Sequence, residues 1–267
     1  MLIGCPKEIK PQEFRVGLTP RAAAEAIAHG HAVLVEPNAG LGTGFTDDAY
    51  RAVGAEIAAD AQEVFARAEM VVKVKEPQAG ERKMLREGQI LFTYLHLAPD
   101  PAQTKDLIES GVTAIAYETV TDRDGRLPLL APMSEVAGKL APQVGAWTLQ
   151  KANGGRGVLM GGVPGVGPAR VVVIGGGVVG TQAARVAAGM GADVTVLDKS
   201  LPRLRQLDDA FRNEFKTGFA SNAWTAELVA EIGATLPVGA PLAVIRGPGE
   251  AAPAPGATAP MDGAKER

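Results

Sequence analysis

The chain contains 267 residues, of which 46% are apolar and 21% are charged. This length suits two domains of ordinary size, and the composition excludes a disordered or fibrous protein. The formal net charge of −3 lacks the basic excess that binds nucleic acid without sequence preference. A single cysteine cannot form an internal disulfide, and no apolar run is long enough to span a membrane. We therefore expect a cytoplasmic protein that binds neither nucleic acid nor a membrane.

Short β-branched runs alternate with amphipathic stretches, which predicts an α/β fold with a mainly parallel sheet. In chain order, strands are predicted over Leu2 to Cys5, Ala32 to Glu36, Met70 to Lys75, Gln89 to Leu95, Val112 to Tyr117, Val171 to Ile174 and Val194 to Leu197. Helices are predicted over Pro20 to Ala28, Pro101 to Ser110, Ser134 to Ala152, Val178 to Met190 and Leu201 to Phe211.

Cationic and titratable residues lie near predicted strand ends in the first half of the chain, where open α/β sheets bind ligands. Arg15 suits a substrate carboxylate, although a surface arginine is an equal alternative. Lys73 and Lys75 bracket Val74 and are predicted to share one face of the strand end. Either lysine could hold a carboxylate or polarise a carbonyl, and the alternative is a solvated strand end. His96 could pass a proton to or from a substrate oxygen, or be a structural histidine.

The segment from Val171 onward predicts a strand, a GxGxxG turn and a helix. Gly175 permits the tight turn, Gly177 lets the backbone approach a pyrophosphate, and Gly180 lets the helix pack closely on the strand. Asp198 ends the following strand at the spacing expected for a group that binds the adenosine ribose hydroxyls. A carboxylate there favours NAD over NADP. The motif therefore predicts a dinucleotide site.

Arg203 follows Asp198 by five residues and tempers this preference. It could accept a 2′-phosphate, and the alternative is an exposed helix charge. The histidines and the single cysteine lack the spacing of metal ligands, so no metal site is predicted.

A change of character near Pro128 to Ser134 predicts a domain boundary, because a proline-bounded turn there precedes a long helix. We expect an N-terminal α/β substrate domain over 1–130 and a Rossmann-type, doubly wound NAD-binding domain over 131–239. Residues 240–267 are rich in proline, alanine and glycine and show no period, which predicts a disordered tail.

From Met1 to about Gly239 the chain resembles the alanine dehydrogenases. The segments that carry the resemblance are Glu13-Phe-Arg-Val, Val74-Lys-Glu-Pro, Leu91-Phe-Thr-Tyr-Leu-His-Leu-Ala, Ala116-Tyr-Glu-Thr-Val, Leu129-Leu-Ala-Pro-Met-Ser-Glu-Val-Ala-Gly and Gly155-Arg-Gly-Val-Leu-Met-Gly-Gly-Val-Pro-Gly. The resemblance implies reversible NAD-dependent deamination of L-alanine to pyruvate and ammonia. It also implies a homo-oligomer, since members of the family are typically hexamers.

The resemblance also implies a role for each candidate residue. His96 would be the proton donor or acceptor, and Arg15 and Lys75 would bind the substrate carboxylate and carbonyl. The implied cofactor contacts are Ser134, Gly175, Gly177, Val178, Val179, Gly180, Asp198 and Arg203.

The resemblance ends after Gly239, where the family's second catalytic residue, an aspartate near the nicotinamide, has no counterpart. We interpret the chain as a truncated or frameshifted member. One alternative is a catalytically inactive NAD-binding module. Another is the NAD-binding subunit of proton-translocating transhydrogenase, which shares the two-domain plan. His96 favours the dehydrogenase, because the transhydrogenase strand lacks a histidine there.

Overall fold

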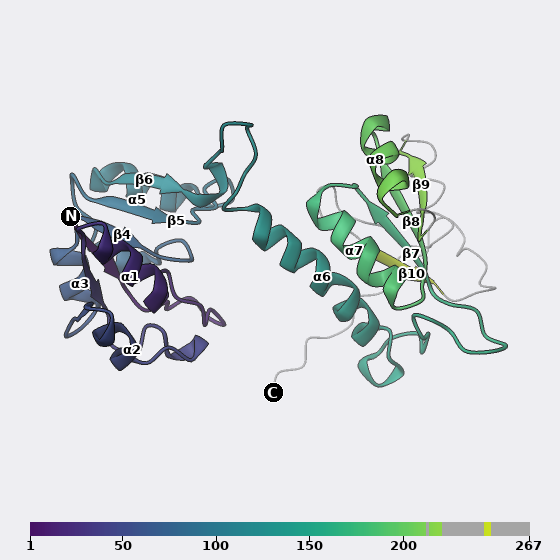
Figure 1. Cartoon of the computed structure of the whole chain (residues 1–267), viewed down its shortest axis with the longest axis horizontal. Helices are drawn as coiled ribbons and strands as arrows, with labels where there is room; N and C mark the ends of the chain where they lie inside the picture. Colours follow the sequence, from purple (N-terminus) through teal and green to yellow (C-terminus); the bar gives the residue numbers. More distant parts are fainter. Residues whose placement is uncertain (212–213, 221–242, 247–267) are drawn as a thin grey trace. The chain divides into compact units, whose positions relative to one another are not determined.

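The computed structural model describes residues 1–211, 214–220 and 243–246. The chain divides into two compact units, Met1–Leu130 and Ala131–Arg267 (Figure 1). Each unit has helices packed around one sheet. The strands of the first sheet are all parallel, and in the second sheet one edge strand is antiparallel. The prediction of an α/β fold is therefore confirmed. None of the described helices combines the length and the hydropathy that spanning a bilayer requires.

Unit 1 contains a six-stranded parallel sheet in the order β3-β2-β1-β4-β5-β6. Its strands are β1 (Leu2–Cys5), β2 (Ala32–Val35), β3 (Glu56–Ile57), β4 (Met70–Val72), β5 (Ile90–Thr93) and β6 (Thr113–Ala116). Its helices are α1 (Pro20–Ala28), α2 (Asp47–Ala52), α3 (Ala61–Arg67), α4 (Ala79–Arg82) and α5 (Pro101–Ser110), with short 3₁₀ turns η1 (Leu41–Thr43) and η2 (Tyr117–Thr119).

Local sequence explains where the long helices of unit 1 begin and end. Thr19 accepts a hydrogen bond from the third residue after it at the start of α1, and Asp100 does the same for α5. A proline follows each cap, in the position where its missing N–H costs nothing. Gly111 ends α5 with a φ of 68°, which glycine adopts without strain. These signals explain why both helices have the predicted bounds.

Unit 2 contains a four-stranded sheet in the order β10-β7-β8-β9. Its strands are β7 (Arg170–Ile174), β8 (Asp193–Asp198), β9 (Lys216–Phe219) and β10 (Ala243–Arg246), and the first three run parallel. Its helices are α6 (Ala131–Thr148), α7 (Val178–Gly189) and α8 (Leu201–Phe211), with the 3₁₀ turn η3 (Lys151–Asn153). Val171, Val194 and Val196 are at most 2% exposed and form its core with buried alanines of α7.

Helices α6 and α7 pack closely at a glycine. A Cβ added to the buried Gly138 would lie 2.3 Å from the carbonyl oxygen of Val179. Glycine at this position therefore allows the two backbones to approach. Helix α6 begins at Ala131, three residues before its predicted start, so Ser134 lies within the helix. Ser134 is four residues before Gly138 and therefore lies on the same helix face, one turn earlier.

Other segments differ from prediction as well. The strand predicted over Met70 to Lys75 ends at Val72. Within the predicted tail 240–267, residues 243–246 form β10, which pairs antiparallel with β7 and was not predicted. The rest of that tail lies outside the described residues.

Candidate functional site

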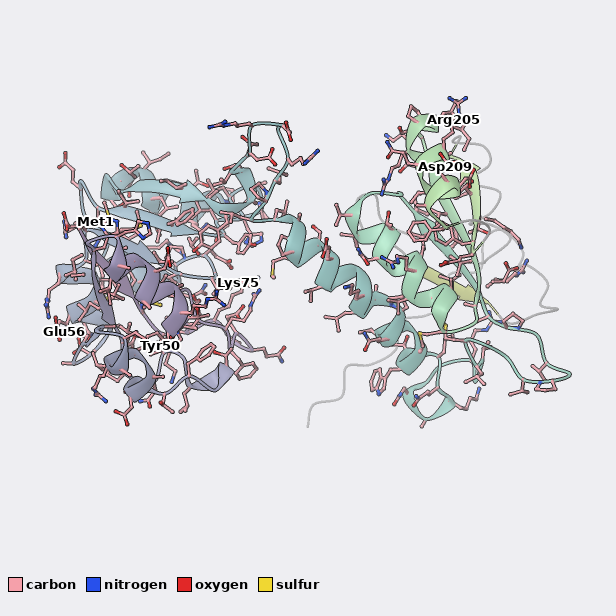
Figure 2. The ribbon with its side chains drawn as sticks, in the orientation of Figure 1. Met1, Tyr50, Glu56, Lys75, Arg205 and Asp209 are labelled. Carbon is pink, nitrogen blue, oxygen red and sulfur yellow. The ribbon has the colours of Figure 1, made fainter. Side chains whose placement is uncertain are left out.

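Polar side chains follow four neighbouring strands of unit 1. Strands β1, β4, β5 and β6 lie side by side in that order and run parallel. The loops after them therefore meet at the carboxyl edge of the sheet. Lys75 marks this region in Figure 2. We call the group the polar cluster, and its members are Lys10, Glu13, Arg15, Lys75, Glu76, Tyr94, His96 and Glu118.

Arg15 is anchored by the carboxylate two residues before it. Its Nε and Nη2 atoms donate to Glu13 Oε1 and Oε2 at 2.8 and 2.6 Å, in the bidentate geometry that guanidinium favours. The Glu13 side chain is 7% exposed and that of Arg15 is 43% exposed. The hydrogen bond from Arg15 holds the pKa of Glu13 below its ordinary value, and the charge of Lys75 acts in the same direction. Arg15 thus presents a fixed, partly exposed cation near Lys75.

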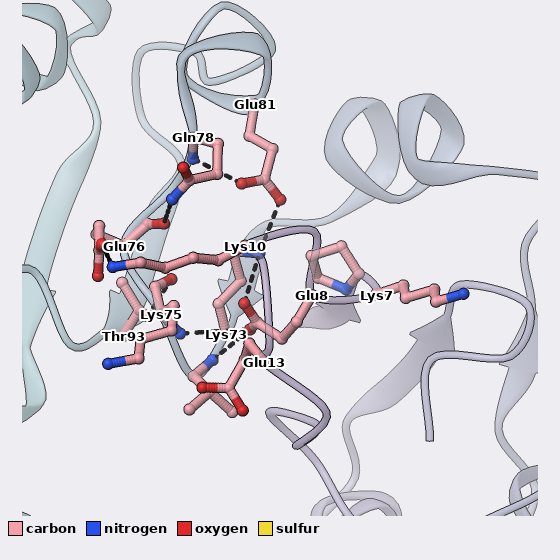
Figure 3. Close-up of polar contacts among 12 residues, drawn as sticks. Lys7, Glu8, Lys10, Glu13, Lys73, Lys75, Glu76, Gln78, Glu81 and Thr93 are labelled. Atoms are coloured by element: carbon pink, nitrogen blue, oxygen red, sulfur yellow. Dashed lines mark hydrogen bonds and ion pairs between the residues drawn. The ribbon is translucent and has the colours of Figure 1, made fainter. Parts of the chain in front are cut away.

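The two lysines after β4 have different surroundings (Figure 3). Lys73 is fully buried, and its Nζ atom lies 2.7 Å from Glu81 Oε1 and 3.3 Å from Glu8 Oε2. Lys75 is half-buried, and its ammonium forms no ion pair or hydrogen bond with the residues that the structure describes. Because the strand ends at Val72, the prediction that the lysines share a face of its end was wrong. Lys75 is the member of this pair that can reach a bound molecule.

Glu8 fixes the loop that carries Lys75. Its Oε1 atom accepts hydrogen bonds from the amides of Val74 and Lys75 at 2.6 and 3.4 Å, while its other oxygen faces Lys73. Burial raises the pKa of Glu8, although the Lys73 ammonium and the Val74 amide oppose that shift. The backbone of Lys75 is therefore tied to a buried group of charges.

His96 faces a carboxylate with one nitrogen of its ring. Its Nδ1 atom lies 3.3 Å from Glu76 Oε2, a buried oxygen without a hydrogen-bond partner among the described residues. The other oxygen of Glu76 pairs with Lys10. Burial alone would raise the pKa of Glu76, but the Lys10 hydrogen bond and the nearby His96 lower it below its ordinary value. The His96 side chain is 49% exposed, so its Nε2 atom is the nitrogen left for a ligand.

The ring of Tyr94 lies beside that of His96, and its hydroxyl is influenced by the charge of Arg15. Its ring centroid lies 6.0 Å from that of His96, and its hydroxyl donates to the carbonyl of Leu129 at 2.5 Å. Burial raises the pKa of Tyr94, and the positive charge of Arg15 partly offsets that rise. The structure therefore brings the predicted Arg15, Lys75 and His96 into one connected cluster.

Three carboxylates of the polar cluster were not predicted as site residues: Glu13, Glu76 and Glu118. Each lies in a segment that carries the family resemblance described above. Their residue type gave no separate signal, because a carboxylate in a loop is usually solvated. The structure shows what each one contacts: Glu13 binds Arg15, Glu76 faces the His96 ring, and Glu118 accepts the His96 amide.

The glycine turn of unit 2 joins β7 to α7. Gly175 has a φ of 98°, which requires glycine, and its carbonyl oxygen lies 1.8 Å from where a Cβ of Gly180 would be. Gly177 caps α7, yet a Cβ added there would meet no atom within 4 Å among the described residues other than its chain neighbours. The first and third glycines are thus required by the fold itself, whereas the second leaves open space. That space, at the N-terminus of a twelve-residue helix, suits a pyrophosphate.

Asp198 and Arg203 both hold the glycine turn. Asp198 Oδ2 accepts the Gly176 amide at 2.6 Å, and its Oδ1 accepts the Ser200 amide at 2.8 Å. Arg203 Nε donates to the carbonyl of Gly176 at 2.6 Å, and its Nη2 donates to Thr181 Oγ1 at 2.8 Å. Arg203 is therefore no exposed helix charge, and its guanidinium already binds the turn.

The other predicted cofactor contacts adjoin this turn. Val178 begins α7 and is 44% exposed, and the carbonyl of Val179 packs against Gly138 of α6. Ser134 lies on that face of α6, one turn earlier. In the described part of the chain, no group of three His, Cys, Asp or Glu side chains is placed to hold a metal ion.

Comparison with known proteins gives consistent matches. Residues 4–137 match the family "Alanine dehydrogenase/PNT, N-terminal domain", and residues 141–253 match "Alanine dehydrogenase/PNT, C-terminal domain". An alanine dehydrogenase from Halomonas elongata is 55% identical over 244 residues, which cover 90% of this chain and 66% of that protein. The chain thus spans just under two thirds of that relative's length.

Solved structures show the same likeness. An L-alanine dehydrogenase superposes with a TM-score of 0.80 at 49% identity, covering 86% of this chain and 64% of that one. A transhydrogenase from Sinorhizobium meliloti superposes with a TM-score of 0.70 at 25% identity, covering 86% of this chain and 67% of that one.

Proposed function

The chain belongs to the alanine dehydrogenase/PNT family, and on that basis we propose that it catalyses NAD-dependent oxidative deamination of L-alanine to pyruvate and ammonia, and the reverse reaction. The observation that carries this proposal is the convergence of Arg15, Lys75 and His96 at one edge of a parallel sheet. These residues supply two cations and a proton-transfer group. Such a set suits a small substrate with a carboxylate next to a reacting carbon.

Arg15 and Lys75 bind and orient the substrate in this proposal. The guanidinium, held in place by Glu13, pairs with the substrate carboxylate. The Lys75 ammonium lies on the loop fixed by Glu8 and donates to the carbonyl oxygen of pyruvate. A cation at that oxygen stabilises the negative charge that develops when the carbonyl carbon is attacked.

His96 moves the proton. Because Nδ1 faces Glu76, Nε2 takes a proton from the substrate oxygen or returns one to it. The Glu76 carboxylate stabilises the ring when it carries both protons. A neutral histidine can accept a proton near physiological pH and a charged one can donate it, so the same residue serves both directions.

The glycine turn would hold NAD. Gly177 and the first amides of α7 suit the pyrophosphate, and Asp198 can accept ribose hydroxyls with the lone pairs that its two amide partners leave. Ser134, Val178, Val179 and Arg203 surround the turn in the same proposal. When bound, NAD accepts the hydride that leaves the substrate carbon.

The direct test is NADH formation by the purified full chain in the presence of L-alanine and NAD. We expect the NADH absorbance to rise only when both are present, and to fall when pyruvate and ammonium are added to NADH. NAD binding by calorimetry without any NADH formation would contradict the proposal and favour an NAD-binding module.

The glycines of the turn give a matched prediction. Gly177→Ala should lower NAD affinity about tenfold to a hundredfold without changing the melting temperature, because its methyl group fills open space. Gly180→Ala should also destabilise unit 2 by about 1–3 kcal/mol, because its methyl group meets the Gly175 carbonyl. Calorimetry and thermal unfolding measure both. Gly189→Ala in the same helix, where a Cβ also has room, is the control and should keep both properties.

A further inference from the structure

His96 has a backbone conformation that is uncommon for a residue other than glycine. Its φ is 50°, in the left-handed region, where a side chain crowds the backbone. A non-glycine residue held there costs about 1–3 kcal/mol and persists only when its surroundings fix it. The structure must therefore contain groups that hold His96 in this state.

Glu118 supplies such a restraint. Its Oε1 atom accepts the amide of His96 at 2.7 Å and that of Leu95 at 3.1 Å, and its Oε2 atom accepts the Leu95 amide at 3.2 Å. One carboxylate thus binds two successive backbone amides, at the residue in the left-handed conformation and the residue before it. Hydrogen bonds to an ionised acceptor are stronger than neutral ones.

The element that carries Glu118 is itself fixed against the end of β5. Glu118 lies in η2, directly after β6, which pairs with β5. The ring of Tyr117 packs edge-on against Phe92 and Tyr94, with centroid distances of 4.3 and 5.0 Å. Glu118 is therefore presented by a packed turn rather than by a freely moving loop.

We propose that Glu118 is a positioning residue that holds the Leu95–His96 backbone in its left-handed conformation and so aims the His96 imidazole at the substrate. The inference rests on the proposed function, in which His96 transfers the proton. Glu118 acts through the backbone, whereas Glu76 contacts the ring, so the two carboxylates fix different parts of the same residue.

The first test measures the restraint without activity. In the full chain labelled for NMR, Glu118→Ala should raise the hydrogen-exchange rate of the His96 amide at least about tenfold and shift the resonance of the imidazole Cε1–H. Glu118→Gln, which keeps one acceptor oxygen, should give a smaller change and guards against a variant that unfolds. Glu109→Gln, an exposed carboxylate on α5, is the control and should change neither signal. Unchanged His96 signals in both Glu118 variants would overturn the proposal.

The second test uses the rate. Glu118→Ala should lower kcat up to about a hundredfold with KM changed much less, because a misaimed group costs transition-state stabilisation. In a His96→Asn background the same substitution should have almost no further effect. Equal losses in both backgrounds would show a general structural role and overturn the proposal. No NADH formation by the unchanged chain would contradict the proposed function, and full activity of His96→Asn would contradict the role of His96 in proton transfer. In either case the exchange measurement still decides whether Glu118 holds the backbone.

Discussion

Replacing Lys73 with methionine is expected to lower the free energy of unfolding by about 3–5 kcal/mol. The Lys73 side chain is fully buried, and its two partners, Glu8 and Glu81, are 2% and 4% exposed. Methionine has a similar length but no charge, so the substitution leaves two buried carboxylates without their cation. Denaturant unfolding of the full chain, followed in parallel with circular dichroism, measures the loss.

If unpaired buried charge causes this loss of stability, the loss should depend on pH. Burial already raises the pKa of Glu8, and Lys73 is the main group that opposes this rise, so the variant should raise it further. A carboxyl whose pKa is raised by folding binds more protons in the folded state than in the unfolded state. Its contribution to the free energy of unfolding therefore falls as the pH rises above the ordinary pKa of the carboxyl. The loss in free energy of unfolding caused by Lys73→Met should therefore be smallest near pH 4, roughly where glutamate ordinarily titrates. It should be largest near neutral pH.

The matched control for this prediction is Lys105→Met. Lys105 is 74% exposed and pairs with Glu109 one turn away on α5, so its loss should change stability by less than about 0.5 kcal/mol. Adding Glu81→Gln to Lys73→Met should recover part of the loss, because one unpaired buried charge is removed. A deficit that is independent of pH would instead point to packing as the cause.

Replacing His96 with asparagine is expected to lower kcat/KM by about a hundredfold to ten-thousandfold, the usual contribution of general acid–base catalysis. Asparagine tolerates the left-handed conformation better than most residues, so the backbone at this position should be retained. The imidazole is lost, and with it the group that moves the proton in the proposed reaction. Initial rates of NADH formation in the presence of L-alanine measure the effect.

His29→Asn serves as the control for that substitution. His29 follows α1, is mostly exposed, and its Nδ1 atom contacts the carbonyl of Glu25 in its own helix. Its replacement should leave the rate unchanged. NAD affinity should be the same in both variants, because the glycine turn lies in unit 2. A His96→Asn rate within about threefold of the original would mean that another group transfers the proton.

The sequence predicted best those features that are encoded locally. The strand, glycine turn and helix from Val171 onward form as expected, and caps and glycines explain the ends of α1 and α5. The short elements were missed, because α2, α3 and α4 have four to seven residues and are too short to show a period. Strands β3 and β9 were missed as well.

Features that depend on distant partners could not be predicted. Lys73 and Lys75 look alike in the sequence, and what separates them is Glu8, which lies 65 residues before Lys73 and reaches it through the fold. In the same way, the pairing of β5 with β6 brings Glu118 close to His96. Arg203 likewise contacts a turn that lies 27 residues earlier in the chain. Pattern and spacing located the cations and the histidine, whereas the carboxylates that orient them became visible in three dimensions.

In the proposed NAD site, the two amides that Asp198 holds limit how the coenzyme preference can change. A substitution that removes the carboxylate to admit a phosphorylated ribose also releases the amides of Gly176 and Ser200. Arg203 is the nearby cation that could bind that phosphate, but to do so it would have to break its hydrogen bond to the Gly176 carbonyl. A switch of coenzyme at this site therefore requires several coordinated substitutions, and single changes during evolution or engineering should cost affinity for both coenzymes first.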